Sequence, residues 1–309
     1  DKTVTANFTR QYTLNISVLP AGSGTTLPSV GQHAYDAGGV VSIEAQAAAG
    51  YRFSGWTGPV ADAGSVATTV TMDSDKTVTA NFTRQYTLNI SVSPAGGGTT
   101  LPSVGQHTYD AGTVVGIEAQ AAAGYRFSGW TGSVADAASA ATTVTMNSDK
   151  TVTANFTRQY TLNTSVSPAG SGTTLPSVGQ HAYDAGEVVS IEAQAAAGYR
   201  FSGWTGPVAD AGSATTTVTM NSDKTVTANF TRQYTLNISV SPAGGGTTLP
   251  SAGLHIYDAG TVVDINAFEG EGHTFSGWTG PVANAASAAT TVTMNSDKTV
   301  TANFLPDTF

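Results

Sequence analysis

Carboxylates recur along the chain at one constant spacing, and they are the first candidates for chemistry. Glu44, Glu118 and Glu192 stand at the same point of three sequence copies, and the fourth copy has Asn266 there. A glycosidase needs two carboxylates at a defined separation across a cleft. Nothing pairs with these glutamates at a recognisable spacing, so we predict no catalytic residues, and the enzyme class has no motif in its favour.

Metal binding has two sets of candidate ligands, and neither forms a site. A metal ion needs several ligands together, but each of the first three copies has a single histidine, and the chain has no Cys. The histidines are His33, His107, His181 and His255, with His273 added in the fourth copy. Calcium needs clustered oxygens, but no Asp-x-Asp-x-Asp-Gly loop occurs around Asp36, Asp62, Asp73 or Asp75. Turn formation explains these aspartates, and we predict no metal and no cofactor.

One tryptophan occurs in each copy, within Ser-Gly-Trp-Thr-Gly. The four are Trp56, Trp130, Trp204 and Trp278. An exposed indole could stack on a sugar, whereas a buried indole packs the core and has its N–H hydrogen-bonded. A unit of about 74 residues needs its largest side chain inside. We therefore predict that these tryptophans are structural core residues.

Two further patterns could be modified covalently. Lys76, Lys150 and Lys224 could form isopeptide bonds with Asn, but this requires a buried acid, and Lys76 follows a turn and is predicted to be exposed. Asn-x-Ser/Thr sequons, which are potential glycosylation sites, recur on the predicted outward face of strands. They begin at Asn7, Asn15, Asn81, Asn89, Asn155, Asn163, Asn229 and Asn237. Asn and Thr also simply suit the wet face of a strand.

The composition excludes several classes of protein. Charged residues make up 11 % of the 309 residues and the formal net charge is −9, so the chain lacks the clustered Lys and Arg of a nucleic-acid binder. No apolar run reaches the ~18 residues of a membrane-spanning helix. A basic region followed by an apolar one, as in a secretion signal, does not open this segment.

An internal repeat dominates the sequence. The motif Asp-Lys-Thr-Val-Thr-Ala-Asn-Phe begins at Asp1, Asp75, Asp149, Asp223 and Asp297, a constant spacing of 74 residues. This period is longer than the 20–50 residues of solenoid repeats and is long enough for a small independent domain. We therefore expect four domains in a row.

Polar and apolar residues alternate within each repeat, which is the signature of strands with one wet face. Tyr12, Leu14, Ile16 and Val18 form one such apolar face, and similar alternation covers 41–47, 69–72 and 77–82. Turn residues separate these segments at 20–22, 36–38, 55–58 and 73–75. Only the Ala-rich residues 45–49 could be helical, so we predict an all-β fold.

Turn chemistry also predicts where each repeat begins. Residues 73–75 suit a turn, so 68–72 and 76–82 are expected to form a closing hairpin, with Thr83-Arg84-Gln85 as linker. The predicted domains are 12–82, 86–156, 160–230 and 234–304, with 1–8 as an orphan strand and 305–309 as a tail. Short linkers predict a stiff rod of roughly 100–150 Å.

The motifs resemble a known family. Each unit runs from Tyr-Thr-Leu-Asn through Gly-Tyr-x-Phe-x-Gly-Trp to Thr-Val-Thr-Met and Lys-Thr-Val-Thr-Ala-Asn-Phe, and unit four departs at Gly272-His273-Thr274-Phe275. This pattern is similar to the divergent internalin-type B repeat of bacterial and archaeal surface proteins. The resemblance implies an extracellular location, a spacer or adhesive role and no catalytic activity. Relatives have a β-grasp-like fold, and both this fold and a small β-sandwich are compatible with the sequence.

These observations predict a non-enzymatic stalk of a cell-surface protein. One alternative is an array that binds glycans or matrix through four weak sites. Unit four distinguishes the two, because Leu254, Ile256 and Phe268 should be exposed in a binding tip and packed in a capping unit. The other alternative is a filament, in which the apolar face of residues 1–8 pairs head to tail with another copy. The residues of that assembly strand are Lys2, Val4, Ala6 and Phe8.

Overall fold

The computed structural model describes residues 1–307, which contain strands and no helix. This confirms the all-β prediction. Residues 45–47, the start of the Ala-rich stretch that could have been helical, belong to a strand. The chain divides into two compact units, 1–158 and 159–309. Each unit holds two repeats and is described by itself.

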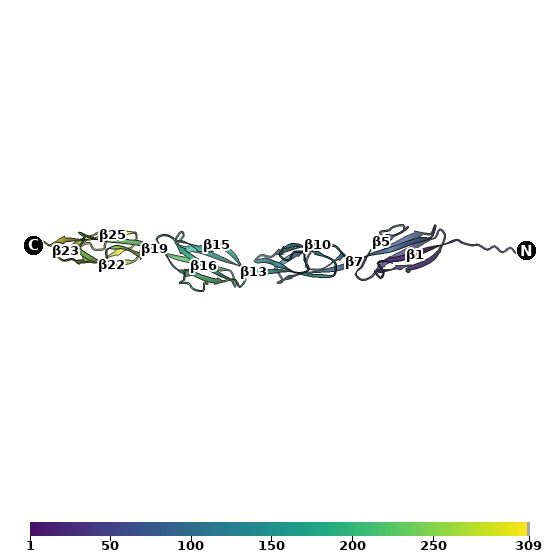
Figure 1. The fold of residues 1–309 in the computed structure, drawn as a ribbon, viewed down its shortest axis with the longest axis horizontal. Coiled ribbons are helices and arrows are strands. Elements are labelled where there is room, and N and C mark those ends of the chain that lie inside the picture. Colours follow the sequence, from purple (N-terminus) through teal and green to yellow (C-terminus); the bar gives the residue numbers. More distant parts are fainter. Residues whose placement is uncertain (308–309) are drawn as a thin grey trace. The chain divides into compact units, whose positions relative to one another are not determined.

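The first unit contains repeats 1 and 2. The strands of repeat 1 are β1 (Gln11–Leu19), β2 (Gly24–Leu27), β3 (Gly31–Asp36), β4 (Val40–Ala47), β5 (Tyr51–Thr57), β6 (Ala67–Thr71) and the first half of β7 (Lys76–Ser93). Repeat 2 continues with β8 (Gly98–Leu101), β9 (Gly105–Asp110), β10 (Val114–Ala121), β11 (Tyr125–Gly132), β12 (Ala141–Thr145) and β13 (Lys150–Ser167). Figure 1 shows β7 running from the repeat of β1 and β5 into the repeat of β10.

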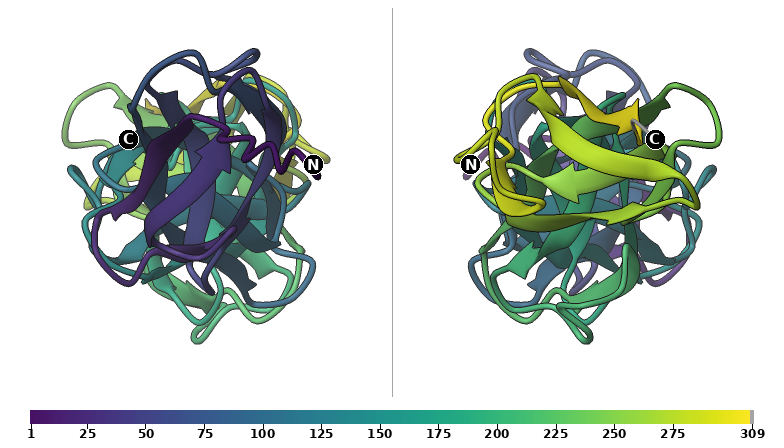
Figure 2. Two further views of the ribbon diagram at one scale, coloured as in Figure 1. Left: turned by 90° about the vertical axis from the view of Figure 1, so that its right-hand side faces the viewer. Right: turned by 90° about the vertical axis from the view of Figure 1, so that its left-hand side faces the viewer.

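The second unit contains repeats 3 and 4. Repeat 3 uses the second half of β13 with β14 (Gly172–Leu175), β15 (Gly179–Asp184), β16 (Val188–Ala195), β17 (Tyr199–Thr205), β18 (Thr215–Thr219) and β19 (Lys224–Ser241). Repeat 4 adds β20 (Gly246–Leu249), β21 (Gly253–Asp258), β22 (Val262–Glu269), β23 (His273–Thr279), β24 (Ala289–Thr293) and β25 (Lys298–Pro306). Figure 2 views repeat 1 and repeat 4 from their ends, where the twist of the strands is visible.

Each repeat is a sandwich of two sheets. In repeat 1 the larger sheet has the order β3-β1-β7-β5, and the smaller has the order β2-β4-β6. All neighbours are antiparallel except β1 and β7, which are parallel. Both sheets contribute to one core: Leu14 and Val78 come from the larger sheet, and Ile43 and Met72 come from the smaller sheet and its end. A β-grasp fold packs its sheet on a helix, so the sandwich is the better description of residues 1–307.

The predicted closing hairpin is wrong. β6 pairs with β4 in the smaller sheet, whereas β7 pairs with β1 and β5 in the larger one. The turn at Asp73-Ser74-Asp75 therefore carries the chain between sheets. Turn chemistry alone does not reveal whether the flanking strands pair with each other, because the same residues serve a hairpin and a crossing between layers.

The predicted linker is also strand. Thr83, Arg84 and Gln85 lie inside β7, which runs for 18 residues through two repeats. The sequence Thr-Arg-Gln contains no glycine or proline that would end a strand, so the ladder continues: Thr83 pairs with Arg52 of β5, and Gln85 pairs with Asp110 of β9. The last strand of repeat 1 and the first strand of repeat 2 are thus one element.

The predicted turn at residues 55–58 is a β-bulge within β5. The register against β7 shifts between Phe53 and Gly55, where Gly55 has a φ of +133°. This left-handed conformation is open to glycine and strained for other residues. The bulge brings Trp56 opposite Ala80 and into the core. Ser-Gly-Trp therefore orients the indole towards the core and does not reverse the chain.

The terminal segments differ from expectation in part. Residues 2–8 form no strand, and the side chains of Val4 and Phe8 are 91 % and 94 % exposed. At the other end, Leu305 and Pro306 of the predicted tail belong to β25, and the amide of Asp307 donates to the carbonyl of Gly272 at 2.9 Å. Residues 308–309 lie outside the described part of the chain.

Candidate functional site

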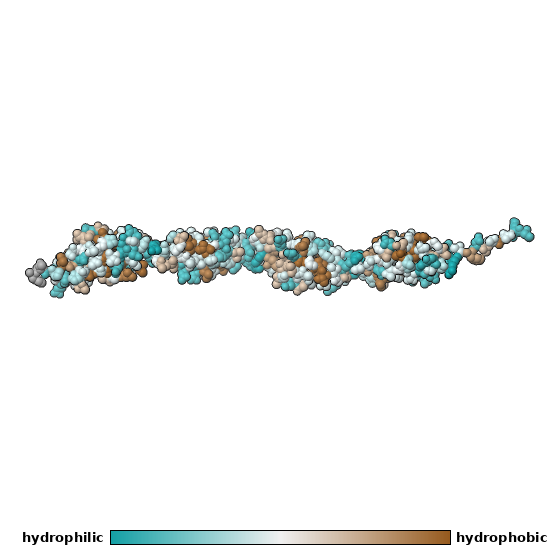
Figure 3. Space-filling model, turned by 90° about the horizontal axis from the view of Figure 1, so that it is seen from above, coloured by the Kyte–Doolittle hydropathy of each residue, from teal (hydrophilic) through white to brown (hydrophobic). Residues whose placement is uncertain are grey.

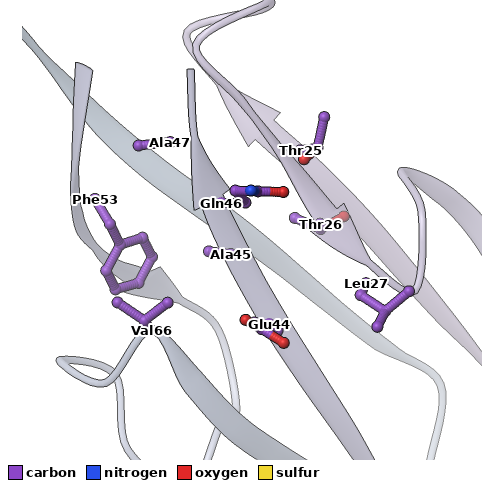
Figure 4. A pocket seen from close by; sticks show the side chains of 9 residues that line it. All are labelled: Thr25, Thr26, Leu27, Glu44, Ala45, Gln46, Ala47, Phe53 and Val66. Atoms are coloured by element: carbon purple, nitrogen blue, oxygen red, sulfur yellow. The ribbon is translucent and has the colours of Figure 1, made fainter. Parts of the chain in front are cut away.

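The candidate catalytic glutamates lie on the outer face of the smaller sheet, and no second acid lines the hollows beside them. Glu44 of β4 lines a shallow hollow of about 710 Å³ together with Leu27, Gln46 and Phe53 (Figure 4). No other ionisable side chain lines this hollow. A pair of carboxylates for glycoside hydrolysis is therefore not assembled here.

The histidines make local contacts. The ring Nε2 of His33 lies 2.7 Å from the carbonyl oxygen of Ser29, so Nε2 carries the hydrogen and donates it. His107, His181 and His255 repeat this bond at 2.6 to 2.7 Å. Within residues 1–307 no group of three or more His, Asp or Glu side chains could hold a metal ion.

The aspartates near the turns accept hydrogen bonds from the backbone. Asp75 Oδ1 accepts from the amide of Thr13 at 2.8 Å, and Asp62 Oδ1 accepts from the amide of Gly64 at 2.9 Å. The first bond connects the start of the seventh strand of the repeat to its first strand, and the second closes an Asx turn. Both carboxylates thus stabilise the fold through hydrogen bonds to the backbone.

The four tryptophans are buried, each with 5 % of its surface exposed. The indole N–H of Trp56 donates to the carbonyl of Ser65 at 3.1 Å, and its ring packs edge-on against Phe53 with centres 5.8 Å apart. The ring faces the interior, which leaves no platform on which a sugar could stack.

Three of the sequon asparagines, Asn81, Asn155 and Asn229, lie opposite the β-bulge. Asn81 Nδ2 donates to the carbonyl of Gly55 at 3.0 Å and to Thr57 Oγ1 at 2.8 Å, across the bulge. Asn155, Asn229 and Asn303 repeat both bonds, although Asn303 is followed by Phe-Leu and is not a sequon. The bulge therefore explains this asparagine without a glycan. Glycosylation remains a prediction, and the exposed sequon asparagines are Asn7, which lies before the first strand, and Asn237 on β19.

Lys76 is less exposed than its place after a turn predicts. Its side chain is 16 % exposed, and its Nζ lies 2.5 Å from Asp73 Oδ1. The β7 strand begins at Lys76, so the stem of the side chain lies along the sheet and only its end reaches solvent. No buried acid accompanies it among the described residues, and an isopeptide bond is not supported.

The most elaborate side-chain arrangement in each unit lies where two repeats meet. In the first unit, Arg52 of repeat 1 forms an ion pair with Asp110 of repeat 2, in which Arg52 Nε lies 2.7 Å from Oδ1 and 2.9 Å from Oδ2. Gln85 Nε2 donates to the same carboxylate at 3.2 Å. The Arg84 guanidinium lies between two tyrosines, 5.1 Å from the ring centre of Tyr51 and 5.4 Å from that of Tyr86. We call these six residues the junction of repeats 1 and 2.

Backbone bonds complete this junction. The amide of Gln85 donates to the carbonyl of Gly50 at 2.8 Å, and the amide of Ala111 donates to the carbonyl of Arg84 at 2.8 Å. The continuous strand is thus held on one side by repeat 1 and on the other by repeat 2. Bending there requires breaking backbone bonds, a bidentate ion pair and two cation–π contacts together.

The second unit repeats the junction between repeats 3 and 4. Arg200 Nε lies 2.7 Å and 2.9 Å from the two carboxylate oxygens of Asp258, and Gln233 donates to Asp258 at 3.1 Å. Arg232 lies 5.0 Å from the ring centre of Tyr199 and 5.4 Å from that of Tyr234. The same arrangement in both units shows that it belongs to the repeat.

Repeat 4 does not have the residues with which repeat 1 contributes to its junction with repeat 2. His273, Thr274 and Pro306 occupy the positions of Tyr51, Arg52 and Arg84. Thr274 Oγ1 instead donates to Asp307 at 2.7 Å. The sequence alone shows the departure Gly272-His273-Thr274-Phe275. It does not show that an ion pair between repeats is lost, because Arg52 and Asp110 are 58 residues apart and nothing in the sequence pairs them.

The junction predicts a pH-dependent coupling. Hydrogen bonds from Arg52, and more weakly from Gln85, hold the pKa of Asp110 below its ordinary value. A lowered native pKa stabilises the fold above the pKa of the free carboxylate, and this contribution is lost as the pH falls through the native pKa. A double-mutant cycle with Arg52→Gln and Asp110→Asn should show favourable coupling at pH 7.

The same cycle, measured by denaturant unfolding at the lowest pH where all four proteins stay folded, should show that coupling reduced or gone. Glu118→Gln, an exposed change on the smaller sheet, is the control and should not couple to Arg52 at either pH. Equal coupling between Arg52 and Asp110 at both pH values would contradict the assignment.

The fold and the junctions define a class: tandem β-sandwich repeats joined through shared strands. The family described as the divergent InlB B-repeat domain matches residues 14–86, 88–160, 162–234 and 236–308, and the chain belongs to this family. The suspected resemblance is confirmed. The search of curated proteins finds no match for the chain.

Repeats of this family are typically associated with surfaces. In residues 1–307 no helix is long and apolar enough to cross a membrane. The family ranges begin two residues and end four residues later than the predicted domains, and the boundaries at 86–88 and 234–236 lie inside β7 and β19. A cut between the two repeats of a unit is therefore a convention, because the strand is continuous there.

Proposed function

We propose that the chain is a non-enzymatic, extracellular spacer that holds another part of a surface protein away from its anchor. The observation that carries this proposal is the junction, in which β7 and β19 each pass through two repeats without interruption. A spacer must resist folding back on itself, and a shared strand flanked by an ion pair and stacked Arg and Tyr supplies that resistance.

The surface chemistry supports a spacer as well. The exposed large apolar side chains are distributed over all four repeats, and on the face in Figure 3 they form small areas separated by paler and polar ones. Scattered apolar residues are normal for a soluble surface, whereas a contiguous patch would indicate a binding partner. The formal charge of −9 adds mutual repulsion between copies.

The test is a length series. Chains of two, three and four repeats should give extended particles whose maximum dimension grows by the same increment with each repeat, measured by small-angle X-ray scattering and electron microscopy. Light scattering should report monomers for residues 1–309 and for 9–309. A compact four-repeat particle would contradict the spacer, and association of 1–309 that is lost in 9–309 would favour the filament.

A filament joined head to tail meets an obstacle at the junction. The start of repeat 1 has its half of the junction, because Asp36 accepts from Gln11 at 3.0 Å as Asp110 accepts from Gln85. The end of repeat 4 offers Thr274 where an arginine would be needed. Residues 1–8 remain the assembly candidate if a filament forms, because Val4 and Phe8 are exposed.

Repeat 4 is the second candidate, as a binding tip for surface glycans or matrix. Leu254, Ile256 and Phe268 are 66 %, 61 % and 53 % exposed, as expected of a tip and not of a capping repeat. Leu254 and Ile256 lie on β21, at the edge of the larger sheet, and Phe268 lies on β22 of the smaller sheet. The apolar residues are thus divided between two sheets, which favours the spacer as the main role.

A further inference from the structure

The first and last strands of every repeat are parallel neighbours. In repeat 1, residues 14–19 of β1 pair in register with residues 76–81 of β7, six residue pairs in all. The same register joins β7 to β13, β13 to β19, and β19 to β25. The chain enters a repeat at the start of the first strand and leaves it at the end of the last one.

This geometry fixes how tension acts on a repeat. Pulling on the chain draws the first strand towards its N-terminal end and the last strand towards its C-terminal end. Because the two strands are parallel and adjacent, the pull is directed along them and shears the ladder. The evenly spaced bonds of a parallel pair are then strained together, whereas peeling the strands apart from one end would break them one after another.

Side chains reinforce the same ladder. In repeat 1, the amide of Thr13, just before the paired segment, donates to Asp75 Oδ1 at 2.8 Å, and Ser17 Oγ lies 2.7 Å from Thr79 Oγ1. The other three repeats have both contacts at 2.7 to 2.8 Å: Thr87–Asp149 and Ser91–Thr153, Thr161–Asp223 and Ser165–Thr227, Thr235–Asp297 and Ser239–Thr301.

The inner face of the ladder is closed to water. Leu14, Val78 and Ala80 are all 0 % exposed and face the smaller sheet. Water therefore has little access to the ladder from this side while the repeat is intact. Sliding one strand along the other also moves apolar side chains out of the cavities that they fill, which adds packing to the bonds that must fail together.

Within a unit, no flexible loop separates the last strand of one repeat from the first strand of the next. The last strand of repeat 1 becomes the first strand of repeat 2 inside β7, and β19 does the same for repeats 3 and 4. A loop between repeats would extend before any ladder was loaded. A shared strand instead passes tension directly from one parallel pair to the next.

We propose that the parallel pair of each repeat is a mechanical clamp, and that the array bears tension applied along the chain. This deepens the spacer role: the protein would keep its length under pulling force as well as at rest. The clamp is a property of each repeat, so its test does not depend on whether the spacer proposal is correct.

The test is single-molecule force spectroscopy on the full chain. The protein has no cysteine, so two introduced cysteines define the points of attachment. Thr9→Cys with Leu305→Cys, both exposed positions, loads all four clamps in shear. We expect one unfolding event per repeat, each lengthening the chain by roughly 240–270 Å less the folded length of the repeat.

A control changes the direction of loading and confines the load to repeat 1. Thr9→Cys with Ser74→Cys pulls on the adjacent starts of β1 and β7 and peels the clamp of repeat 1. At the same pulling speed this protein should unfold at a several-fold lower force. Equal forces in the two geometries would overturn the clamp, as would end-to-end unfolding without resolved force peaks.

A second variant tests the ladder itself. Ser17→Ala with Thr79→Val removes the side-chain contact in repeat 1 while keeping the shape of the two residues close to the original. In the end-to-end geometry, one of the four events should move to lower force and three should not. The length series described above would meanwhile give the same result, so failure of the clamp and failure of the spacer are distinguishable.

Discussion

Replacing Trp130 by alanine is expected to lower the free energy of unfolding of repeat 2 by about 3–5 kcal/mol. The indole is buried, its N–H donates to the carbonyl of Ala140 at 3.4 Å, and its ring packs edge-on against Phe127 at 5.9 Å. Removing it leaves a cavity between the two sheets that neighbouring side chains fill only in part. Most of the stability of so small a domain would be lost.

Calorimetry is the suitable measurement, because repeats of similar stability melt together and one weakened repeat melts separately. About a quarter of the heat of unfolding should move to lower temperature. Leu101→Ala, at an exposed position of repeat 2, is the control and should change little. A Trp130→Ala protein that melts like the original but loses binding to a sugar would show that the tryptophan is a binding residue.

The second large effect is expected at Gly98, the first residue of β8. A Cβ there would collide with the ring of Phe156 and the carbonyl of Gln120. In repeat 1 the equivalent Cβ on Gly24 would lie 2.5 Å from Phe82 Cζ and 2.6 Å from the carbonyl of Gln46. Gly98→Ala should therefore cost about 1–3 kcal/mol or more, as overpacking does.

Repeat 2 supplies its own control at Gly116. A Cβ at Gly116 would meet nothing within 4 Å, and repeats 1 and 3 have Ser42 and Ser190 at this position. Gly116→Ala should leave stability unchanged or raise it, because glycine weakens a strand interior. The same calorimetric experiment compares both variants, and equal effects would mean that the close approach at Gly98 is relieved by small movements.

Alternation and turn residues were enough to predict the class of fold. The pattern around Leu14 and Ile16 identified a strand and its buried face, and Asp36 and Gly38 marked a turn, because both signals depend on residues close in sequence. The partner of each strand depends on residues far apart. That is why 68–72 and 76–82 were paired with each other, although each pairs with strands of a different sheet.

The junction shows the same limit for function. Arg52 and Asp110 are unremarkable in sequence, and only the fold brings them together. Turn chemistry predicts Thr83-Arg84-Gln85 as a linker, because residues 73–75 suit a turn and these three do not. Arg84 in fact lies in a strand and stacks on Tyr51 and Tyr86, so the expected linker is part of the sheet.

The parallel pairing of first and last strands also determines when a repeat can fold. The contacts of Thr13 with Asp75 and of Ser17 with Thr79 are each separated by 62 residues, so the larger sheet cannot close until the end of the repeat has been synthesised. Such distant pairing is slow to form. The closing sequence Lys-Thr-Val-Thr-Ala-Asn-Phe is moreover identical in all four repeats. An unfinished repeat could therefore accept the closing strand of a neighbour, an exchange characteristic of repeat proteins. During synthesis the repeats emerge from the ribosome in order. Each closing strand then meets only the unfinished repeat that precedes it, which prevents the exchange.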